Sequence, residues 1–402
     1  MTLHRRIAIA AAVLAAVAPA TAAAAPGEPP PVPGAQAAIV VDARDGAVLF
    51  AKKPDAERSI ASTTKLMTAL LALEQAEPDD VFTAPAYDAM PAESRINLRE
   101  GERMTVQDLL EALLLESAND AAVALAENIS GSREAFVEEM NARAAELGLD
   151  HTSYANPIGL DEEGNYSTAR DLATLARTLL RNRRFARIVH MPEAELQSGI
   201  RPRVVENRND LVAAHPWVSG VKTGYTLNAG NVLVGAAERR PGIRVVSVVL
   251  GEPTEAARDA ETLALLRFGL RSFSAVRVLD RGRALARAGV EHRDETARLV
   301  PRRGVVLTVR DGQHLRRRVD APDELDGPLE AGERVGSVTV LVDGRPVRRV
   351  ALVTATAVPG AGTLRVLLSD LGVPLTLLIG LAILVAAVLT VLRLRIRIRI
   401  AR

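Results

Sequence analysis

The sequence has 402 residues and is 48% hydrophobic, which is enough for two domains with a substantial core. Its 50 Lys and Arg residues balance 49 Asp and Glu residues, so the net charge of +1 gives no reason to expect nucleic-acid binding. The sequence contains no cysteine, which excludes disulfides, thiolate metal sites and cysteine catalysis.

The amino-terminal stretch 1–25 has the pattern of a cleavable secretory signal. Arg5 and Arg6 precede an uncharged apolar run over 7–17, and small residues follow it. An uncleaved membrane anchor is the alternative, although this run is short for a membrane span. The proline-rich segment 26–35 is expected to be a spacer. We therefore expect an exported protein.

Ser62 and Lys65 form a pair that suits nucleophilic catalysis. They enter an apolar run that predicts a buried helix, and residues i and i+3 of a helix share a face, so the lysine amine can reach the serine hydroxyl. Unpaired N–H groups at the start of the helix suit an oxygen that attacks a carbonyl and a product oxygen that carries negative charge. The hypothesis is a serine nucleophile with a lysine as its base.

The use of lysine in the chain strengthens this hypothesis. Lysine occurs only at positions 52, 53, 65 and 222. A serine three residues before a lysine arises by chance in roughly one chain in seven of this composition, so the spacing alone is a weak signal. Arginine cannot lose its proton in a protein, whereas a desolvated lysine can do so near neutral pH. The retained lysines indicate positions where a proton is given up or a compact charge is needed.

Residues 36–271 predict a mixed α/β domain, with an antiparallel sheet flanked by helices. The Pro241-Gly242 turn indicates that the last two strands of this domain form an antiparallel hairpin. The predicted elements are a β-hairpin over 37–50, a helix that begins at 61, a helix over 105–115 that breaks at 117–120 and resumes over 121–126, a helix closed by Gly148, a loop over 156–160, a helix from 171, strands over 218–224, 231–238 and 243–250, and a closing helix over 256–269.

Residues 272–358 have a different pattern. Short valine-rich runs over 305–309, 335–342 and 347–354, combined with Asp-Gly turns, predict a small all-β domain. This region holds no obvious constellation of titratable groups. A structural spacer is therefore favoured over a binding module.

The carboxyl-terminal end predicts a membrane anchor. After a linker over 359–372, residues 373–392 carry no charge and match the thickness of a bilayer core, and the arginine-rich tail 393–402 marks the cytoplasmic side. The alternating tail is also compatible with a strand, and a buried soluble helix is a further alternative. We expect a single-pass cell-membrane protein with a transmembrane helix over 373–392 and an extracytoplasmic catalytic domain.

Three short motifs stand in one order along the α/β domain: Ser62-Thr63-Thr64-Lys65, Ser117-Ala118-Asn119 and Lys222-Thr223-Gly224. With longer matches around these motifs, residues 35–270 resemble the low-molecular-weight penicillin-binding proteins of the D-alanyl-D-alanine carboxypeptidase family. The resemblance implies a β-lactamase/transpeptidase-like catalytic domain, and the β domain and terminal anchor are also similar to the family's layout. It further implies removal of the terminal D-alanine from peptidoglycan stem pentapeptides, with β-lactams as covalent inhibitors and with no cofactor or metal.

The resemblance also implies roles for the residues of the first two motifs. Ser62 attacks the carbonyl of the penultimate D-alanine and forms an acyl-enzyme, which water then hydrolyses. Lys65 serves as base only if burial and a nearby cation, for which Lys222 is the candidate, keep it neutral. Ser117 relays a proton toward the leaving amine, and Asn119 bonds to the substrate amide and to Lys65. Without the other motifs, Ser117 and Asn119 indicate only a helix break with caps.

The third motif is expected to bind substrate. Lys222 and Thr223 suit the terminal carboxylate, and Gly224 permits close approach of the substrate backbone. By similarity, the backbone N–H groups of Ser62 and Tyr225 form the oxyanion hole.

A further candidate for carboxylate binding is Arg258, which lies in the closing helix. The alternative for Arg258 is an ordinary solvated arginine. Asp120 and Asp171 are interpreted as structural residues that pair with a cation such as Arg208.

Three other functions stay open on the sequence. A β-lactamase needs a carboxylate base that hydrolyses its acyl-enzyme rapidly, and Glu162 and Glu163 lie in a loop, but their surroundings are similar to the carboxypeptidase pattern. A DD-endopeptidase uses the same acyl chemistry on peptidoglycan cross-links and differs in the amine that leaves. A catalytically silent wall-binding scaffold has no need of a neutral lysine beside a serine.

Overall fold

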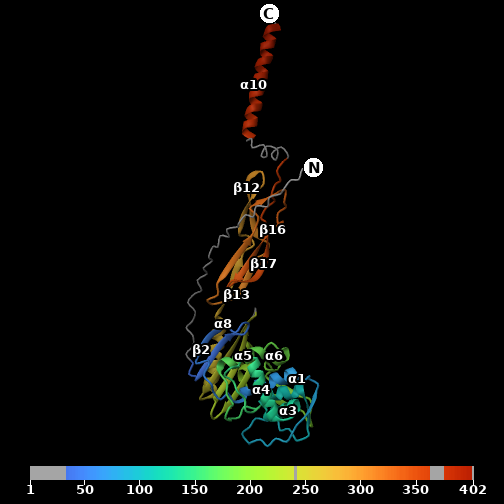
Figure 1. Ribbon diagram of the computed structural model, residues 1–402, viewed down its shortest axis with the longest axis vertical. Helices are drawn as coiled ribbons and strands as arrows, with labels where there is room; N and C mark the ends of the chain where they lie inside the picture. Colours follow the sequence, from blue (N-terminus) through green and yellow to red (C-terminus); the bar gives the residue numbers. More distant parts are fainter. Residues whose placement is uncertain (1–32, 240–241, 363–374, 401–402) are drawn as a thin grey trace, which may run out of the picture. The chain divides into compact units, whose positions relative to one another are not determined.

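The computed structural model describes residues 33–239, 242–362 and 375–400 (Figure 1). The predicted signal peptide lies outside the described residues, as do most of the predicted spacer and linker. The chain divides into two compact units between Ser274 and Ala275.

The first unit is built on a five-stranded antiparallel sheet with the strand order β2-β1-β9-β8-β7. The turn predicted at Asp45-Gly46 joins β1 to β2, and β8 and β9 pair antiparallel as predicted, with Pro241 of their predicted turn outside the described residues. The strand β7, which carries the third motif, lies at an edge of the sheet. These strands are β1 (Ala37–Asp42), β2 (Val48–Lys52), β7 (Val218–Thr226), β8 (Gly230–Arg239) and β9 (Ile243–Glu252).

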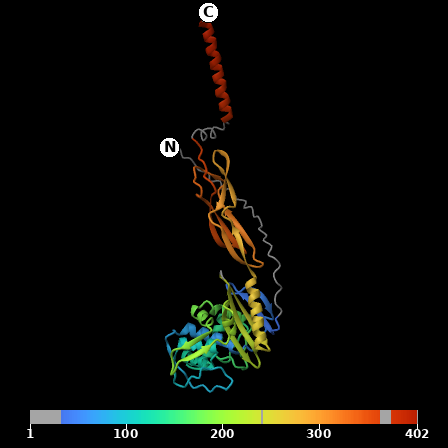
Figure 2. The same ribbon diagram turned by 180° about the vertical axis from the view of Figure 1, so that it is seen from behind.

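Helices cover both faces of this sheet. Successive residues of a strand point to opposite sides, and in β8 and β9 both sets are apolar, so both faces have to be buried. Val234 and Val248 belong to the core formed with α1, α3, α4 and α5, whereas Leu233 and Val249 pack against Leu265 of α8 and its neighbours. Figure 2 shows α8, coloured yellow to orange, running along the strands. The predicted α/β architecture is therefore confirmed.

The helices of this unit are η1 (Ala61–Thr64), α1 (Lys65–Gln75), α2 (Val106–Glu111), η2 (Ala112–Glu116), α3 (Asn119–Ser130), α4 (Arg133–Glu146), α5 (Ala169–Leu179), α6 (Arg183–Ile188), α7 (Asp210–Ala214) and α8 (Glu255–Arg271). Two small hairpins complete it: β3 (Val81–Thr83) with β4 (Arg103–Thr105), and β5 (Glu193–Leu196) with β6 (Arg203–Glu206). The helix predicted over 105–115 is divided, because a π-helical turn, η2, follows α2.

The second unit is all β over residues 275–362, as predicted. Its main sheet has the order β14-β16-β17-β12-β11-β15, and β10 pairs with β13. Alternate residues of β16 and β17, such as Val338, Val340 and Leu352, form its core with Leu279 of β10. The strands are β10 (Phe273–Leu279), β11 (Ala286–Val290), β12 (Arg293–Pro301), β13 (Val305–Arg310), β14 (Leu315–Asp320), β15 (Glu324–Leu325), β16 (Arg334–Val342) and β17 (Arg345–Thr354).

The last described element is α10 (Leu375–Ile400), which includes residues 375–392 of the apolar stretch and most of the arginine-rich tail. The alternating tail is therefore helical over the described residues and does not form a strand. Across the three described ranges, no helix combines the length and the apolar character that crossing a membrane requires. The structure does not support the transmembrane helix predicted over 373–392.

Candidate functional site

The structure brings the serine and the lysine of the first motif together. Ser62 lies in η1, and Lys65 is the first residue of α1. The Lys65 Nζ atom is 3.1 Å from Ser62 Oγ and donates a hydrogen bond of 2.6 Å to the carbonyl oxygen of Ile158. Lys65 is completely buried, whereas Ser62 is partly exposed. A buried amine therefore reaches an accessible hydroxyl, as the helical spacing predicts.

The loop over 156–160 fixes the position of this amine. Asn156 Oδ1 accepts hydrogen bonds from the backbone N–H groups of Gly159 and Leu160 at 2.7 and 3.2 Å, which folds the loop back on itself. The carbonyl of Ile158 then accepts from Lys65, and the carbonyl of Pro157 accepts from Thr68 Oγ1 at 2.7 Å. The sequence predicts a loop here, but the contribution of Ile158 is a backbone group and no side-chain pattern indicates it.

Gly159 lets this loop approach the nucleophile closely. A Cβ atom at Gly159 would lie 2.0 Å from the carbonyl oxygen of Ala61 and 3.0 Å from the amide nitrogen of Ser62. Gly159 also has a φ of +89°, in the region that favours glycine. Only glycine fits this contact without a shift of the backbone beside Ser62.

The third motif approaches Ser62 from β7. Lys222, Thr223 and Gly224 are buried, and a Cβ atom at Gly224 would lie 2.8 Å from the amide nitrogen of Ser62. The next residue, Tyr225, has an exposed side chain. The strand backbone around Gly224 and the Ser62 amide are therefore close neighbours.

The second motif follows the π-helical turn η2. This turn ends at Ser117, whose φ of +65° is left-handed and reverses the chain before α3. The Ser117 hydroxyl is buried and has no hydrogen-bond partner among the described residues. The N-cap residue of α3 is Ala118, and no side chain caps this helix. Ser117 is therefore the C-cap residue of η2, as the helix-break interpretation expects, whereas Asn119 does not cap α3.

Asn119 is held by a residue that the sequence does not single out. Its Nδ2 atom donates a hydrogen bond of 2.6 Å to Glu93 Oε2, and its backbone N–H donates to the carbonyl of Ser94 at 2.8 Å. In the described part of the chain, Asn119 shares no hydrogen bond with Lys65. Glu93 lies between β3 and β4 in a segment without a motif, so no sequence signal points to it.

Burial and like charges lower the pKa of both lysines of the site. Burial holds the pKa of the Lys65 amine well below its ordinary value of 10.5, and the Lys222 cation lowers it further, whereas Glu93 and Asp120 act in the opposite direction. Burial, followed by neighbouring arginines, lowers the pKa of Lys222 to about 7. Both effects on Lys65 favour the uncharged form of its amine.

Arg258 is buried in α8, so the alternative of a solvated arginine is wrong. Its guanidinium is 2.8 Å from Asp259 and 3.7 Å from Glu255. Arg258 lies near enough to contribute to the lowered pKa of Lys222. It belongs to the surroundings of the site, but its guanidinium already has carboxylate partners.

The two structural aspartates bond to backbone groups and not to Arg208. Asp120 accepts from the N–H groups of Ile96 and Leu98, and Asp171 accepts from the N–H of His151. Arg208 pairs instead with Glu116. The predicted pairing of these aspartates with Arg208 is therefore wrong, because the loop amides satisfy both carboxylates.

Glu162 and Glu163 lie on the surface of the loop that follows Gly159. Glu162 Oε2 accepts a hydrogen bond of 2.8 Å from Asn156 Nδ2. In the described part of the chain, neither glutamate is hydrogen-bonded to Ser62 or Lys65. The geometry does not favour either as the deacylating base of a β-lactamase.

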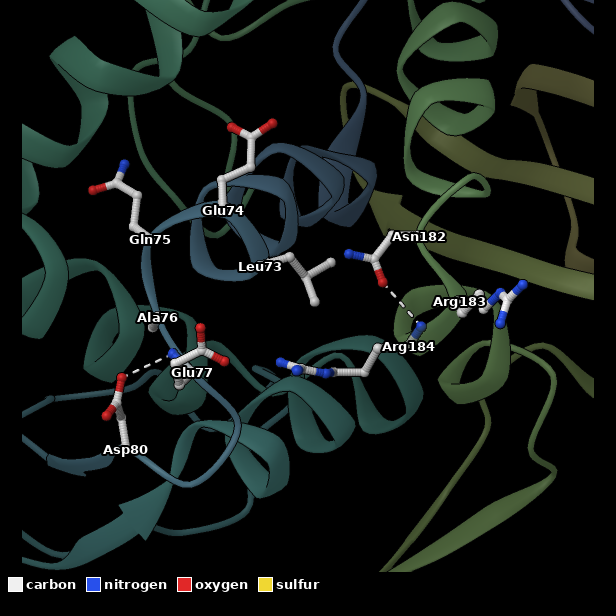
Figure 3. Close-up of a pocket in the computed structure, with 9 residues that line it drawn as sticks. All are labelled: Leu73, Glu74, Gln75, Ala76, Glu77, Asp80, Asn182, Arg183 and Arg184. Atoms are coloured by element: carbon white, nitrogen blue, oxygen red, sulfur yellow. Dashed lines mark hydrogen bonds between the residues drawn. The ribbon is translucent and has the colours of Figure 1, made fainter.

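A cavity of about 490 Å³ lies at the other end of α1 (Figure 3). The length of α1 separates this end from Lys65, a distance of about 15 Å. Glu74 in its wall pairs with Arg143, and Asp80 accepts from the N–H of Glu77. The residues that line it are Leu73, Glu74, Gln75, Ala76, Glu77, Asp80, Asn182, Arg183 and Arg184. None of the motif residues is among them, so this cavity is not the candidate site.

Two protein families match consecutive parts of the chain. Residues 23–254 match the family described as D-alanyl-D-alanine carboxypeptidase, and residues 273–360 match the C-terminal domain of penicillin-binding protein 5. A curated relative, the D-alanyl-D-alanine carboxypeptidase DacF of Bacillus subtilis, is 32% identical over 320 residues, which cover 77% of this chain and 82% of the relative.

Solved structures show the same likeness. Penicillin binding protein 5 from Haemophilus influenzae is 31% identical with a TM-score of 0.60, and the match covers 83% of this chain and 100% of that structure. The Streptomyces K15 DD-transpeptidase is 30% identical with a TM-score of 0.57, and its match covers 60% of this chain and 99% of that structure.

Proposed function

The chain belongs to the D-alanyl-D-alanine carboxypeptidase family, and we propose that it removes the terminal D-alanine from peptidoglycan stem pentapeptides through an acyl-enzyme on Ser62. The chain is accordingly a hydrolase. The observation that carries the assignment of residues is the 3.1 Å contact between the buried amine of Lys65 and the hydroxyl of Ser62.

In the acylation step, Ser62 Oγ attacks the carbonyl carbon of the penultimate D-alanine and its proton passes to the neutral amine of Lys65. The bond from Lys65 to Ile158 holds the nitrogen beside the hydroxyl, so the remaining lone pair accepts the proton. The C–N bond to the terminal D-alanine then breaks, and the leaving amine takes a proton. This proton is the one that Lys65 took from Ser62, and Ser117 relays it; a buried hydroxyl with no hydrogen-bond partner among the described residues supports this role. Water finally hydrolyses the ester and restores Ser62.

The substrate is oriented by β7 and by the amide of the nucleophile. The protonated Lys222 and the Thr223 hydroxyl bind the terminal carboxylate, with Arg258 as a more remote positive charge. The N–H groups of Ser62 and Tyr225 bind the oxyanion that forms during attack. The close approach of Gly224 to the Ser62 amide supports this role, since it brings the backbone of β7 next to the backbone N–H of the nucleophile.

Mass spectrometry of purified pentapeptide muropeptides before and after treatment with the protein tests the proposal. Loss of one alanine from each pentapeptide supports it, whereas separation of cross-linked dimers supports a DD-endopeptidase. Labelled penicillin gives a second readout: a carboxypeptidase keeps the label on Ser62 for a long time, and a β-lactamase releases it rapidly. A variant with Ser62→Ala should retain no label.

The location of the protein follows from its substrate. Peptidoglycan lies outside the cytoplasmic membrane, and the signal pattern over 1–25 supports export of the chain. Attachment to the membrane through 373–392 rests on the sequence alone, namely 20 uncharged residues followed by arginines. Fractionation of cells that express the full chain or a chain ending at residue 362 tests it, because only the full chain should sediment with membranes.

The boundaries of the parts belong to the same proposal. We assign 36–271 to the catalytic domain and 272–358 to a β domain that acts as a structural spacer. The all-β core of the second unit supports this role, since the described residues of that unit bury no charged side chain.

A further inference from the structure

Glu93 makes three hydrogen bonds in the segment between β3 and β4. Its Oε2 atom accepts from Asn119 Nδ2 at 2.6 Å and from the hydroxyl of Tyr87. Its Oε1 atom accepts from the N–H of Met90 at 3.0 Å. Both carboxylate oxygens therefore have partners, and one partner is the last residue of the second motif.

The bond from Glu93 determines which way the Asn119 amide points. An ionised carboxylate only accepts hydrogen bonds, so the atom of Asn119 that faces it has to be the NH₂ group. The Oδ1 atom of Asn119 then lies on the other side of the amide and remains an acceptor. The flipped orientation would place Asn119 Oδ1 against the carboxylate, where it cannot form a hydrogen bond. Without Glu93, this penalty on the flipped orientation is lost.

The segment that carries Glu93 is itself fastened to the start of α3. The backbone N–H of Asn119 donates to Ser94 at 2.8 Å, and Asp120 accepts from Ile96 and Leu98 at 3.1 and 2.9 Å. Tyr87 is held from outside by the guanidinium of Arg133, which lies 5.5 Å from the centre of its ring. Hydrogen bonds to its side chain and to the backbone of its segment therefore fix the position of the Glu93 carboxylate.

We propose that Glu93 is a positioning residue for the carboxypeptidase reaction: it holds the Asn119 amide in one orientation, so that the groups left free by this bond, Oδ1 and the second N–H of Nδ2, meet the amide of the stem peptide. The inference rests on the proposed function of Ser62 and Lys65. Glu93 does not touch the reacting atoms and acts through Asn119. It adds a residue outside the three motifs to the apparatus that holds the substrate.

Glu93 also affects the base through its charge, and this effect is separable from its position. The charged groups that face Lys65 are Lys222 from β7, Asp120 from α3 and Glu93 from the segment between β3 and β4. The groups that face Glu93 are Tyr87, Asn119 and Lys65, with Arg133 behind the tyrosine ring. Loss of the Glu93 charge removes one of the two influences that raise the pKa of Lys65.

Two variants of the same residue separate position from charge. Glu93→Asp keeps the charge but is one methylene shorter, so it loses the 2.6 Å bond to Asn119. Glu93→Gln keeps the length and one acceptor oxygen but loses the charge. Glu100→Gln, at an exposed position of the same segment, is the matched control and should leave the rate unchanged.

The measurement is the second-order rate of acylation by labelled penicillin and kcat/KM for a pentapeptide, each as a function of pH. We expect Glu93→Asp to reduce both by about 10- to 100-fold with an unchanged pH profile. We expect Glu93→Gln to stay within about threefold of the parent at its optimum, with the acidic limb moved to lower pH. Wild-type rates for Glu93→Asp, or an equal loss in both variants, would overturn the proposal.

A double-variant cycle with Asn119→Ala decides whether Glu93 acts through the amide. Glu93→Asp should have almost no further effect once the Asn119 side chain is removed. If it slows the Asn119→Ala protein by the same factor as the parent, Glu93 acts by another route and the proposal fails. Failure of the proposed function gives a different result, because the parent itself then neither retains penicillin on Ser62 nor releases D-alanine.

Discussion

The two units of the chain differ in what they bury. Among the described residues of the second unit, the buried polar side chains are those of Ser337 and Thr354, and neither is charged. The first unit buries several charged groups, including both lysines of the site. The units also differ in net charge: residues 33–274 carry 26 Lys and Arg against 35 Asp and Glu, whereas residues 275–362 carry 16 against 12. Buried charge is costly, so its presence in one unit indicates where the chemistry lies.

Within the first unit, two kinds of buried charge can be told apart by their partners. Arg203 pairs with Glu102 at 2.8 Å, which is the ordinary solution for a charge in a protein interior. Lys65 bonds to a carbonyl and a hydroxyl, and the largest influence of another residue on its pKa comes from the like charge of Lys222. The ion pair of Arg203 stabilises the charged form of a buried side chain, whereas the surroundings of Lys65 favour the uncharged form of its amine. A base that works near neutral pH needs surroundings of the second kind.

Replacement of the buried lysine should have the largest effect on activity. Lys65→Arg places a group that cannot lose its proton beside Ser62, so we expect acylation by labelled penicillin to fall by about 10²- to 10⁴-fold. Lys53→Arg, the same change at an exposed position, should leave the rate unaltered. Full activity of the Lys65→Arg protein would show that another group is the base.

Gly159 tests whether the close contact beside the nucleophile matters. Gly159→Ala places a Cβ atom 2.0 Å from the carbonyl of Ala61, so we expect a loss of more than about 2 kcal/mol in the free energy of unfolding and a marked loss of acylation. Gly148→Ala is the matched control, because Gly148 has a φ of +68° but no described atom lies within 4 Å of the position that its Cβ would take. It should cost only about 1 kcal/mol and leave acylation intact. Equal losses for the two variants would show that backbone conformation, and not the contact, is responsible.

The pKa of Lys222 predicts a smaller, pH-dependent effect. Lys222 has to be protonated to bind the carboxylate of the substrate, and it loses its proton as the pH rises through about 7. We therefore expect kcat/KM for a pentapeptide to fall about tenfold per pH unit above this value. Lys222→Arg keeps the charge at all these pH values, so its profile should be flat in the same range. A fall that persists in Lys222→Arg would assign the alkaline limb to another group.

The sequence predicts the fold better than it predicts the contacts of the site. The strands over 37–50 and 218–250 follow from short apolar runs bounded by Asp-Gly or Pro-Gly turns, which are local signals. The division of the helix over 105–115 does not follow, because its last residues, Leu113, Leu114 and Leu115, would also continue an ordinary α-helix and give no sign of the π-helical turn η2. That turn places Ser117 in a left-handed conformation, so the geometry of the second motif depends on packing and not on pattern.

The same limit applies to the residues that support the motifs. The spacing of Ser62 and Lys65 predicts their contact, since both lie on consecutive turns of one helical segment. Ile158 bonds to Lys65 across a separation of 93 residues, and Glu93 bonds to Asn119 across a separation of 26 residues. No local pattern encodes such pairs. Sequence reasoning therefore identifies the reacting groups but not the groups that hold them.

A substitution in the second unit should have the smallest effect on activity, and it tests the contrast between the units directly. Leu352 is fully buried in the core of that unit, so Leu352→Ala should reduce its stability by about 2–5 kcal/mol. Val347→Ala, at an exposed position of the same strand, is the control and should cost little. Because the second unit buries no charge in its described part and contributes no motif residue, acylation of Ser62 by penicillin should change by less than about twofold in either variant. A large loss of acylation in Leu352→Ala alone would mean that the β domain takes part in forming the site, and the assignment as a spacer would have to be withdrawn.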